Sequence, residues 1–376
     1  MTKSRLLDIL RSASPAHQIM SLPDIDLGVA ELEPFPFLAI VGQEEMKLAL
    51  VLSVINPHVG GVLLIGSRGT AKTTAARALT DLLPRTRRSL CANGCTEEML
   101  AEGGMVAICK SCATRVGYGQ PLTVEDRVRI FELPLNARLD DVVGSVNERV
   151  AMEQQRVRLE RGILAQADGH VLYIDEVNLL ENSVADAILD AAAQGFYIVR
   201  RGPMNMRYRS RFQLIGSMNP EEGRLRPQLM DRFGLRALVQ GLSSTAERYE
   251  AYQQALLYRQ KPDALAAAYA DQTLALAQEI EQARQRLATV TIGDAARQLG
   301  LDLIQKLQVD SSRAEITLFE AARAYAAADE RLEVTAADIQ TVSLIALRMR
   351  TSPALHAFFE AQGAEDDQLR ELVNGE

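Results

Sequence analysis

The stretch from Gly61 to Leu79, GVLLIGSRGTAKTTAARAL, has residue types and a spacing that suit phosphate chemistry. The apolar run Val62 to Ile65 predicts a short buried strand, and a helical pattern opens at Lys72 after a glycine-containing loop. Backbone N–H groups of such a loop and the positive end of the helix dipole converge on one point, which suits a nucleoside triphosphate. The predicted phosphate-binding residues are Gly66, Gly69, Thr70, Ala71, Lys72, Thr73 and Thr74.

Two side chains of this loop have definable tasks, and one residue departs from the usual pattern. Lys72 would reach the β- and γ-phosphates as a point charge, and the Thr73 hydroxyl would hold Mg²⁺. Ala71 stands where the pattern G-x-x-x-x-G-K-[ST] has its second glycine. A Cβ there is harmless at negative φ and costs about 1 kcal/mol or more at positive φ. We expect Ala71 to be a tolerated variant.

Polar residues follow two further apolar runs. Val171 to Ile174 predicts a buried parallel strand, which would deliver Asp175 and Glu176 to the edge of the sheet where ligands bind. Asp175 would hold the hydration shell of Mg²⁺, and Glu176 would polarise the attacking water as a general base. Asn219 ends a third apolar run and could hold that water, although an asparagine before proline is also a plain turn residue.

The segment EEGRLRPQLMDRFGL, residues 221–235, is rich in arginine. A guanidinium is always charged and forks onto two oxygens, which suits an arginine finger that reaches the γ-phosphate in a neighbouring subunit. The alternative is a local salt bridge to Glu221, Glu222 or Asp231. Arg313, at the start of a predicted helix, is a further candidate for the nucleotide. The arginines of the segment are Arg224, Arg226 and Arg232.

All four cysteines of the chain fall in one short stretch, as Cys91-Ala-Asn-Gly-Cys95 and Cys109-Lys-Ser-Cys112. Two short pairs separated by a loop can gather four thiolates around a tetrahedral Zn²⁺, and a reducing cytosol argues against disulfides. A surface insertion with free thiols and an iron–sulfur cluster remain open as alternatives.

These residues need a nucleotide-binding sheet and a second, helical unit to position them. We predict an α/β fold with a P-loop parallel sheet, helices on both faces and an all-helical lid domain after it. Residues 1–36 form an N-terminal arm with a short helix, and residues 37–244 form the nucleotide-binding domain. That domain contains a Cys-rich insertion at 90–113 and a hairpin with a basic tip at 196–208. The lid domain spans residues 245–376.

Hydrophobic periodicity places the remaining elements. Helices are predicted before the loop, after it and throughout the lid, and a solvated basic turn is predicted at Arg85 to Arg88. The predicted strands, apart from the hairpin, are 62–65, 128–133, 171–174 and 212–219. The predicted helices are 45–55, 73–83, 150–167, 184–193, 245–258, 262–288, 294–308, 313–328 and 335–350, with a loop or short helix at 138–144.

The composition excludes several classes of protein. The chain has 376 residues, of which 47% are hydrophobic and 24% charged, as in an ordinary globular protein rather than a disordered or fibrous one. Its net charge of -8 argues against dedicated nucleic-acid binding. No apolar run reaches the roughly 18 residues of a membrane helix, and no signal peptide is recognisable at the N-terminus. We therefore expect a cytoplasmic protein.

Taken together, the motifs resemble one family. GSRGTAKTT, VLYIDEVNLL, IGSMNPEEGRLRPQLMDRFGL and SSRAEITLFEAARA closely resemble the AAA+ ATPases of the magnesium chelatase I-subunit type, over about Phe37 to Arg350. The resemblance implies a hexameric ring with ATP between subunits. It further implies Arg232 as the trans arginine finger, with Arg226 as the second choice, and Arg313 as the sensor of the lid. Ala71, Thr73-Thr74 and the residue before Asn-Pro in IGSMNP, where the family often has glycine, depart from the usual pattern.

The resemblance also implies a function. Members of this family drive Mg²⁺ insertion into protoporphyrin IX for chlorophyll biosynthesis. Their partners are a subunit with an integrin-like metal-binding domain and a large porphyrin-binding subunit, both separate chains. Two alternatives remain open. One is a MoxR-like remodelling ATPase that acts on a different metal- or cofactor-dependent partner, and the other is a non-enzymatic, nucleotide-dependent scaffold.

Overall fold

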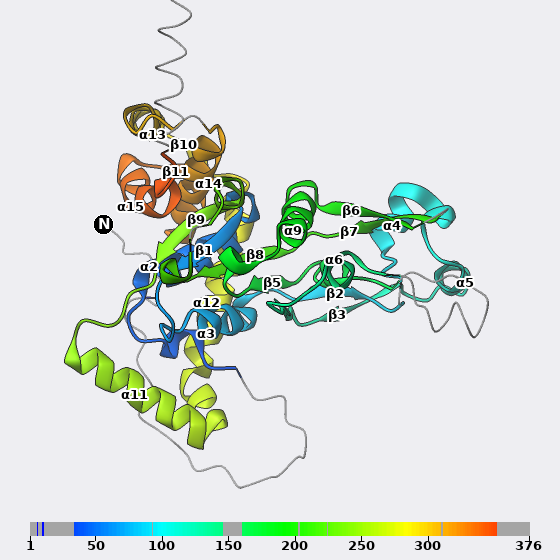
Figure 1. Ribbon diagram of the computed structural model, residues 1–376, viewed down its shortest axis with the longest axis horizontal. Helices are drawn as coiled ribbons and strands as arrows, with labels where there is room; N and C mark the ends of the chain where they lie inside the picture. Colours follow the sequence, from blue (N-terminus) through cyan, green and yellow to red (C-terminus); the bar gives the residue numbers. More distant parts are fainter. Residues whose placement is uncertain are drawn as a thin grey trace, which may run out of the picture.

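A computed structural model of the 376-residue chain has a central body, a helical region beyond it and an extended arm (Figure 1). The structure describes Leu6, Leu10 and residues 34–351, with gaps at 92, 146–159, 202–203, 224 and 310. Most of the predicted N-terminal arm, most of the predicted helix 150–167 and the end of the lid domain therefore lie outside the described residues. So does Arg224. Among the described helices, none is both long and apolar enough to cross a membrane.

A five-stranded sheet with the order β4-β5-β8-β1-β9 forms the centre of the molecule. Every neighbouring pair in it is parallel, with Val62 opposite Ile215 and Leu172 opposite Leu214 as examples of the register. The strands are β1 (Gly61–Ile65), β4 (Ile130–Leu133), β5 (Val171–Ile174), β8 (Gln213–Met218) and β9 (Phe233–Leu238). The predicted α/β fold class with a parallel sheet is confirmed.

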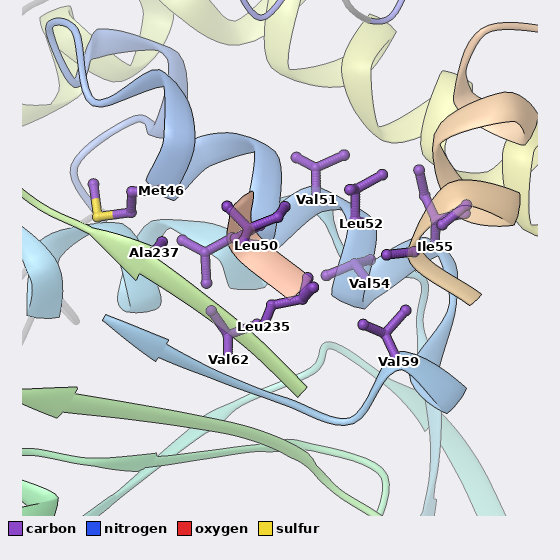
Figure 2. Packing of buried hydrophobic residues seen from close by; sticks show 14 of the residues in the cluster. Met46, Leu50, Val51, Leu52, Val54, Ile55, Val59, Val62, Leu235 and Ala237 are labelled. Carbon is purple, nitrogen blue, oxygen red and sulfur yellow. The ribbon is translucent and has the colours of Figure 1, made fainter. Parts of the chain in front are cut away.

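Helices cover both faces of this sheet. On one face, α2 (Glu44–Ile55) is buried along most of its length and packs Leu50 and Val54 towards Val62 and Leu235 (Figure 2). On the other face, α9 (Asn182–Gln194) contributes Val184, Ile188 and Leu189 to a separate core with the sheet. The shorter helices are η1 (Phe37–Ala39), η2 (Pro57–Val59), α3 (Lys72–Ala78), η3 (Leu79–Leu82), α6 (Leu139–Val143), α8 (Ile163–Gln166), η5 (Val177–Leu179), η6 (Pro220–Glu222) and α10 (Pro227–Arg232).

The described residues between 245 and 351 are almost entirely helical, and the first helix begins at Thr245. Buried alanines on α14 let α12 and α15 pack closely against it, and α14 also contacts α2 and β9 of the body. All five helices predicted for this region are confirmed. They are α11 (Thr245–Gln260), α12 (Pro262–Leu287), α13 (Asp294–Lys306), α14 (Arg313–Ala328) and α15 (Ala336–Leu347), with the two short strands β10 (Thr291–Ile292) and β11 (Glu333–Val334).

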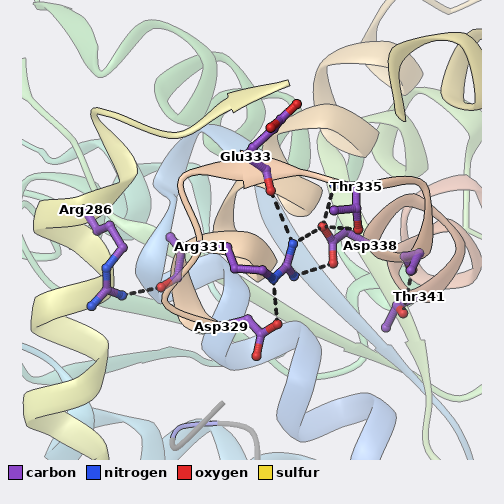
Figure 3. A network of polar contacts seen from close by, with 9 residues as sticks. Arg286, Asp329, Arg331, Glu333, Thr335, Asp338 and Thr341 are labelled. Atoms are coloured by element: carbon purple, nitrogen blue, oxygen red, sulfur yellow. Dashed lines mark hydrogen bonds and ion pairs between the residues drawn. The ribbon is translucent and has the colours of Figure 1, made fainter. Parts of the chain in front are cut away.

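Arg331 fixes the turn between α14 and α15 (Figure 3). Its guanidinium donates to Asp329 Oδ2 at 2.7 Å and to Asp338 Oδ1 at 2.5 Å. Asp338 in turn accepts from the Thr335 backbone N–H and closes a capping box at the start of α15. The hydrogen bond to Asp338 raises the pKa of Arg331 above its usual value. These contacts lock the two lid helices to each other.

Two arginines join the last strand of the sheet to the end of the lid. Arg236 on β9 is 1% exposed and donates to the backbone oxygens of Arg348 and Met230 at 2.6 and 2.7 Å. Arg348 returns a hydrogen bond to the Arg236 backbone oxygen at 2.7 Å and also pairs with Glu45. Burial lowers the pKa of Arg236 to about 9, and the nearby Arg350 adds to that shift.

An arm extends from the body on the side away from the lid (Figure 1). It contains the antiparallel hairpin β6 (Phe196–Arg201) and β7 (Met204–Arg209), as predicted, and a second antiparallel pair, β2 (Thr86–Ser89) with β3 (Thr123–Asp126). The four cysteines lie between β2 and β3, in a segment that we call the cysteine module, residues 90–122. Its helices are α4 (Glu97–Gly103), η4 (Gly104–Ala107) and α5 (Lys110–Gly117).

The basic turn predicted at Arg85 to Arg88 is wrong. Residues 86–89 form β2, which pairs with β3, and Arg88 lies against Asp126 with Nε to Oδ2 at 2.6 Å. Residues 86–89 do not alternate between apolar and polar types, as a strand with one buried face would. The reason is that β2 has no buried face: its two end residues are partly buried and its two middle residues are exposed. Strand β9 was not predicted either, because Arg236 interrupts its apolar run.

Candidate functional site

A cavity of about 330 Å³ opens at the carboxyl ends of β1, β5 and β8. The phosphate loop after β1, the two acids after β5 and the asparagine after β8 meet there because these strands are neighbours in the sheet. The lining residues are Arg68, Gly69, Thr70, Ala71, Lys72, Thr73, Thr74, Asp175, Glu176, Ser217 and Asn219. Of the predicted phosphate-binding residues, Gly66 alone is absent from this lining.

The loop is shaped by Gly66 and Lys72. A Cβ on Gly66 would come within 1.9 Å of the Val239 backbone oxygen, so no side chain fits at this position. Lys72 Nζ donates to the backbone oxygens of Gly66 and Ser67 at 2.6 and 2.7 Å. Burial lowers the pKa of Lys72, while Asp175 and Glu176 partly offset that effect. The ammonium group thus lies at the base of the loop, next to the cavity.

Ala71 lies in the left-handed region, with φ of 66°. The sequence left the sign of this angle open, and the structure has the costly case of positive φ. A Cβ at this conformation destabilises the loop by about 1 kcal/mol relative to glycine. Ala71 is the N-cap of α3, so the strain sits at the point where the backbone turns to present its N–H groups.

Tyr173 joins the loop to the acidic strand end, and sequence reasoning missed it. Its hydroxyl donates to Asp175 Oδ1 at 3.0 Å and lies 2.9 Å from Thr73 Oγ1, which donates in return. Ser217 Oγ also donates to Asp175 Oδ1 and accepts from the Glu176 backbone N–H at 3.0 Å. Burial raises the pKa of Tyr173 to about 12, so this hydroxyl stays protonated. The two oxygens predicted to hold Mg²⁺, on Thr73 and Asp175, are therefore held together.

Glu176 occupies an unusual backbone conformation and has a charged partner. Its backbone φ is 52°, which lies in a sparsely populated region for a non-glycine residue. Residues with such angles cluster at functional sites. Glu176 Oε1 lies 3.0 Å from Arg68 Nη2, which also lies 2.5 Å from Glu222 Oε1. Arg68 is 72% exposed and can swing towards a ligand. Sequence reasoning missed this arginine because the phosphate-loop pattern leaves its position free.

Asn219 is 5% exposed and ends β8 beside the cavity. Its Oδ1 accepts from the Glu221 backbone N–H at 3.3 Å, and its Nδ2 lies 3.4 Å from Glu222 Oε1. The Asn219 side chain therefore stabilises the turn after β8, as expected for an asparagine before proline. It also lines the cavity with Glu176, as the predicted role in holding the attacking water requires.

None of the described candidate arginines lines the cavity of its own chain. Arg313 Nη1 pairs with Asp231 Oδ2 at 2.7 Å, and the buried Arg350 lies on the other oxygen of Asp231 at 3.4 Å. No ion pair joins Arg232 to an acid in the described part of the chain, so the local salt bridge considered for it is absent there. Arg226 has a buried guanidinium nitrogen that meets no hydrogen-bond partner within the described residues.

The four cysteines converge within the cysteine module. Their sulfur atoms all lie within 4.8 Å of one another, and Cys91 and Cys109 Sγ are 4.0 Å apart. A tetrahedral Zn²⁺ with Zn–S of about 2.3 Å needs sulfurs about 3.8 Å apart. Backbone N–H groups of Cys95 and Cys109 point to the sulfurs of Cys91 and Cys95 at 3.4 and 3.2 Å. The donor set fits a metal with four thiolate ligands.

The module has a small core of its own and is tied to the hairpin. Cys95, Ile108, Cys112 and Leu122 form a buried cluster separate from the two cores on the sheet. Glu98 on α4 pairs with Arg209 on β7, whose Nε lies 2.8 Å from Asp168 Oδ2.

Comparison with known proteins gives a consistent result. Residues 122–233 match the AAA domain of the dynein-related subfamily, and residues 301–372 match an AAA lid domain. The magnesium-chelatase subunit ChlI homolog of Methanocaldococcus jannaschii is 39% identical over 90% of this chain and 91% of its own length. Magnesium-chelatase subunit ChlI of Synechocystis sp. is 40% identical over 84% of this chain and 88% of its own.

Two solved structures are also similar. A crystal structure of a protein from Cytophaga hutchinsonii matches 88% of this chain and 90% of its own, with 17% identity and a TM-score of 0.55, which supports the fold alone. A chain in a cryo-EM-based structure of the complex between subunits BchI and BchD of magnesium chelatase has 35% identity. It covers 86% of this chain and 99% of its own with a TM-score of 0.48.

Proposed function

Because this chain belongs to the magnesium-chelatase I-subunit family of AAA ATPases, we propose that it is the ATP-hydrolysing motor of a magnesium-chelatase-type complex. In such a complex, ATP turnover drives Mg²⁺ into a porphyrin through partner subunits, a ligase reaction of chlorophyll biosynthesis. The observation that carries the proposal is the cavity in which the phosphate loop, the Asp175–Glu176 pair and Asn219 meet.

The roles of the cavity residues follow from their positions. Lys72 and the backbone N–H groups of residues 69–74 bind the phosphates of ATP. Thr73 and Asp175 would hold Mg²⁺, which neutralises charge on the phosphates. Glu176 takes a proton from the attacking water, and Asn219 orients that water against the γ-phosphate. Arg68 must leave Glu176 for this carboxylate to act as a base, and the phosphates offer the guanidinium a new partner.

We infer that the chain works as a ring, which we propose to be a hexamer. Arg232 ends α10, does not line its own cavity and lacks an ion-pair partner in the described part of the chain. These features suit a finger that completes the site of a neighbouring subunit, with Arg226 as the alternative. Arg313 would act as the lid sensor, and to reach a γ-phosphate it would have to exchange Asp231 for the nucleotide.

The proposed partners are a subunit with an integrin-like metal-binding domain and a large porphyrin-binding subunit, and the proposed compartment is the cytoplasm. The alternative is a MoxR-like remodelling ATPase with a different metal- or cofactor-dependent target, because the same cavity would serve it. Reconstitution separates the two. The purified chain, mixed with the two partner subunits of a magnesium chelatase, ATP, Mg²⁺ and protoporphyrin IX, should form Mg-protoporphyrin, and Glu176→Gln should not. ATP turnover without metallation by a complex that is otherwise active would favour the alternative.

We also propose that Cys91, Cys95, Cys109 and Cys112 hold a structural Zn²⁺. The close sulfurs, the N–H groups directed at them and the small core of the module support a metal that replaces missing hydrophobic stabilisation. Metal analysis of protein purified without added zinc should find about one equivalent per chain. Less than about half an equivalent, or iron instead of zinc, would contradict the proposal.

A further inference from the structure

A second cavity, of about 620 Å³, lies at the opposite edge of the sheet from the nucleotide cavity. Its walls come from the amino ends of β5 and β8, the carboxyl ends of α2 and α9, the connection into β2 and one residue of α12. It shares no lining residue with the nucleotide cavity and has nearly twice its volume. None of the nucleotide-binding or catalytic roles proposed above uses a residue of its lining.

The lining of this cavity is strongly cationic. Arg85, Arg211 and Arg284 contribute three guanidinium groups, His58 and His170 contribute imidazoles, and the lining includes no carboxylate. The chain as a whole carries a net charge of -8, so acids are plentiful elsewhere. An acid-free group of three arginines in such a chain points to an anionic ligand.

Structural ion pairs with carboxylates do not explain these three arginines. In the described parts of the chain, no ion pair joins Arg85, Arg211 or Arg284 to a carboxylate. Arg284 donates to the Val54 backbone oxygen at 3.0 Å. The nearby Asp168 is already paired with Arg209, and its other oxygen accepts from the Arg211 backbone N–H. Among the described residues, the side-chain forks of Arg85 and Arg211 therefore have no partner and are available to a ligand.

Two neutral groups add hydrogen-bond donors. His170 Nδ1 accepts from the Arg129 backbone N–H at 3.2 Å, which leaves the proton on Nε2. Burial lowers the pKa of His170, and Arg129 adds to that shift, so this side chain is a neutral donor at pH 7. Gln213 also lines the cavity, and its buried side-chain nitrogen finds no hydrogen-bond partner in the part of the chain that the structure describes. A ligand that accepts hydrogen bonds would satisfy it.

The remaining walls are apolar. Val54, Leu83, Val128 and Phe212 face the same space as the arginines, so the cavity combines an apolar surface with cationic forks. Apolar walls suit a flat hydrophobic body, and guanidinium forks suit planar or tetrahedral oxyanions. We propose that this cavity binds an organic polyanion, a flat apolar body that carries two or more carboxylate or phosphate groups. A nucleotide and a porphyrin dicarboxylate both have this chemistry.

The test uses the full chain with Lys72→Ala, which weakens the first nucleotide site. Binding of ADP is followed by calorimetry, and binding of protoporphyrin IX by its fluorescence. We expect at least one probe to bind one site per chain. The double substitution Arg85→Ala with Arg211→Ala should weaken that binding about tenfold or more. Arg211→Lys alone should weaken it less, because the charge remains while the fork is lost.

The control is Arg259→Ala, which removes one exposed positive charge from α11, outside the cavity lining. The affinity of this control for the probe should stay within about twofold of the affinity of the Lys72→Ala chain. Thermal unfolding should show that all variants are folded. ADP binding alone identifies a nucleotide site, and protoporphyrin binding alone a porphyrin site. Binding of neither probe, or equal affinities of the double variant and its parent, would overturn the proposal. ATP turnover by Arg85→Ala/Arg211→Ala with Lys72 intact reports separately on the proposed motor function.

Discussion

The nucleotide cavity and the cysteine module both bring several polar groups to one point, but they do so in opposite ways. The cavity draws its residues from segments as distant as Arg68 and Asn219, and only the order of strands in the sheet makes them neighbours. The module draws its thiols from residues 91–112, and they converge within a small local core. A site of the first kind depends on the large core of the body, whereas we propose that one of the second kind depends on its own ligand.

If this distinction is correct, damage to one site should leave the other intact. The largest effect is expected for Glu176→Gln, which removes the proposed base. ATP turnover should fall about 10²- to 10⁴-fold, while nucleotide affinity and bound zinc stay nearly unchanged. A steady-state phosphate-release assay with nucleotide titration measures this. Glu247→Gln on α11 is the control, and turnover retained by Glu176→Gln would remove this residue from the chemistry.

Removal of one thiol should disrupt the cysteine module and leave the nucleotide cavity intact. Cys95→Ser should abolish zinc binding and make the module sensitive to proteolysis, because its buried cluster is too small to fold unaided. ATP turnover without partners should change by less than about threefold, since the main cores are separate from this cluster. Thr114→Ala, on the same helix as Cys112, should keep its zinc. A collapse of ATP turnover in Cys95→Ser would show that the two sites are not independent.

Tyr173→Phe tests how closely the cavity depends on contacts between segments. The hydroxyl links Thr73 on α3 to Asp175 at the end of β5, and its loss should raise the Mg²⁺ concentration for half-maximal turnover about three- to tenfold. The matched control is Tyr197→Phe, because the buried Tyr197 hydroxyl has no hydrogen-bond partner among the described residues. An unchanged Mg²⁺ dependence in Tyr173→Phe would mean that the two oxygens are held in place by the backbone alone.

The smallest effect concerns a single backbone angle. Ala71→Gly should stabilise the chain by about 1 kcal/mol, because glycine adopts the φ of 66° without a Cβ clash. ATP affinity should be equal or better. Ala75→Gly, in the interior of α3, should instead destabilise by about 1 kcal/mol. Urea unfolding measures both, and a loss of stability in Ala71→Gly would contradict the strain assigned to this loop.

The sequence allowed prediction of the elements whose residues follow a simple period. Strands β1, β5 and β8 are apolar runs that end in polar residues, and the lid helices have clear helical spacing. The same reasoning failed at β9, because the buried Arg236 interrupts its apolar run and is satisfied only by backbone oxygens of distant segments. It failed at β2 because an exposed two-stranded pair has no hydrophobic face to reveal it.

Within the candidate site, the residues that a motif names could be predicted, and the residues that connect them could not. Lys72, Asp175 and Asn219 follow strand ends, so their meeting follows from a parallel sheet. Tyr173 is indistinguishable in sequence from a core residue of its strand. Arg68 occupies a free position of the loop, and its partners Glu176 and Glu222 are set by the fold.

The reciprocal hydrogen bonds between Arg236 and Arg348 have a mechanical consequence. One arginine lies on the last strand of the sheet and the other directly follows the last described helix, and each donates to the backbone oxygen of the other. A rotation of the lid against the sheet would break both bonds and expose a buried guanidinium. These two hydrogen bonds therefore oppose rotation of the lid against the sheet.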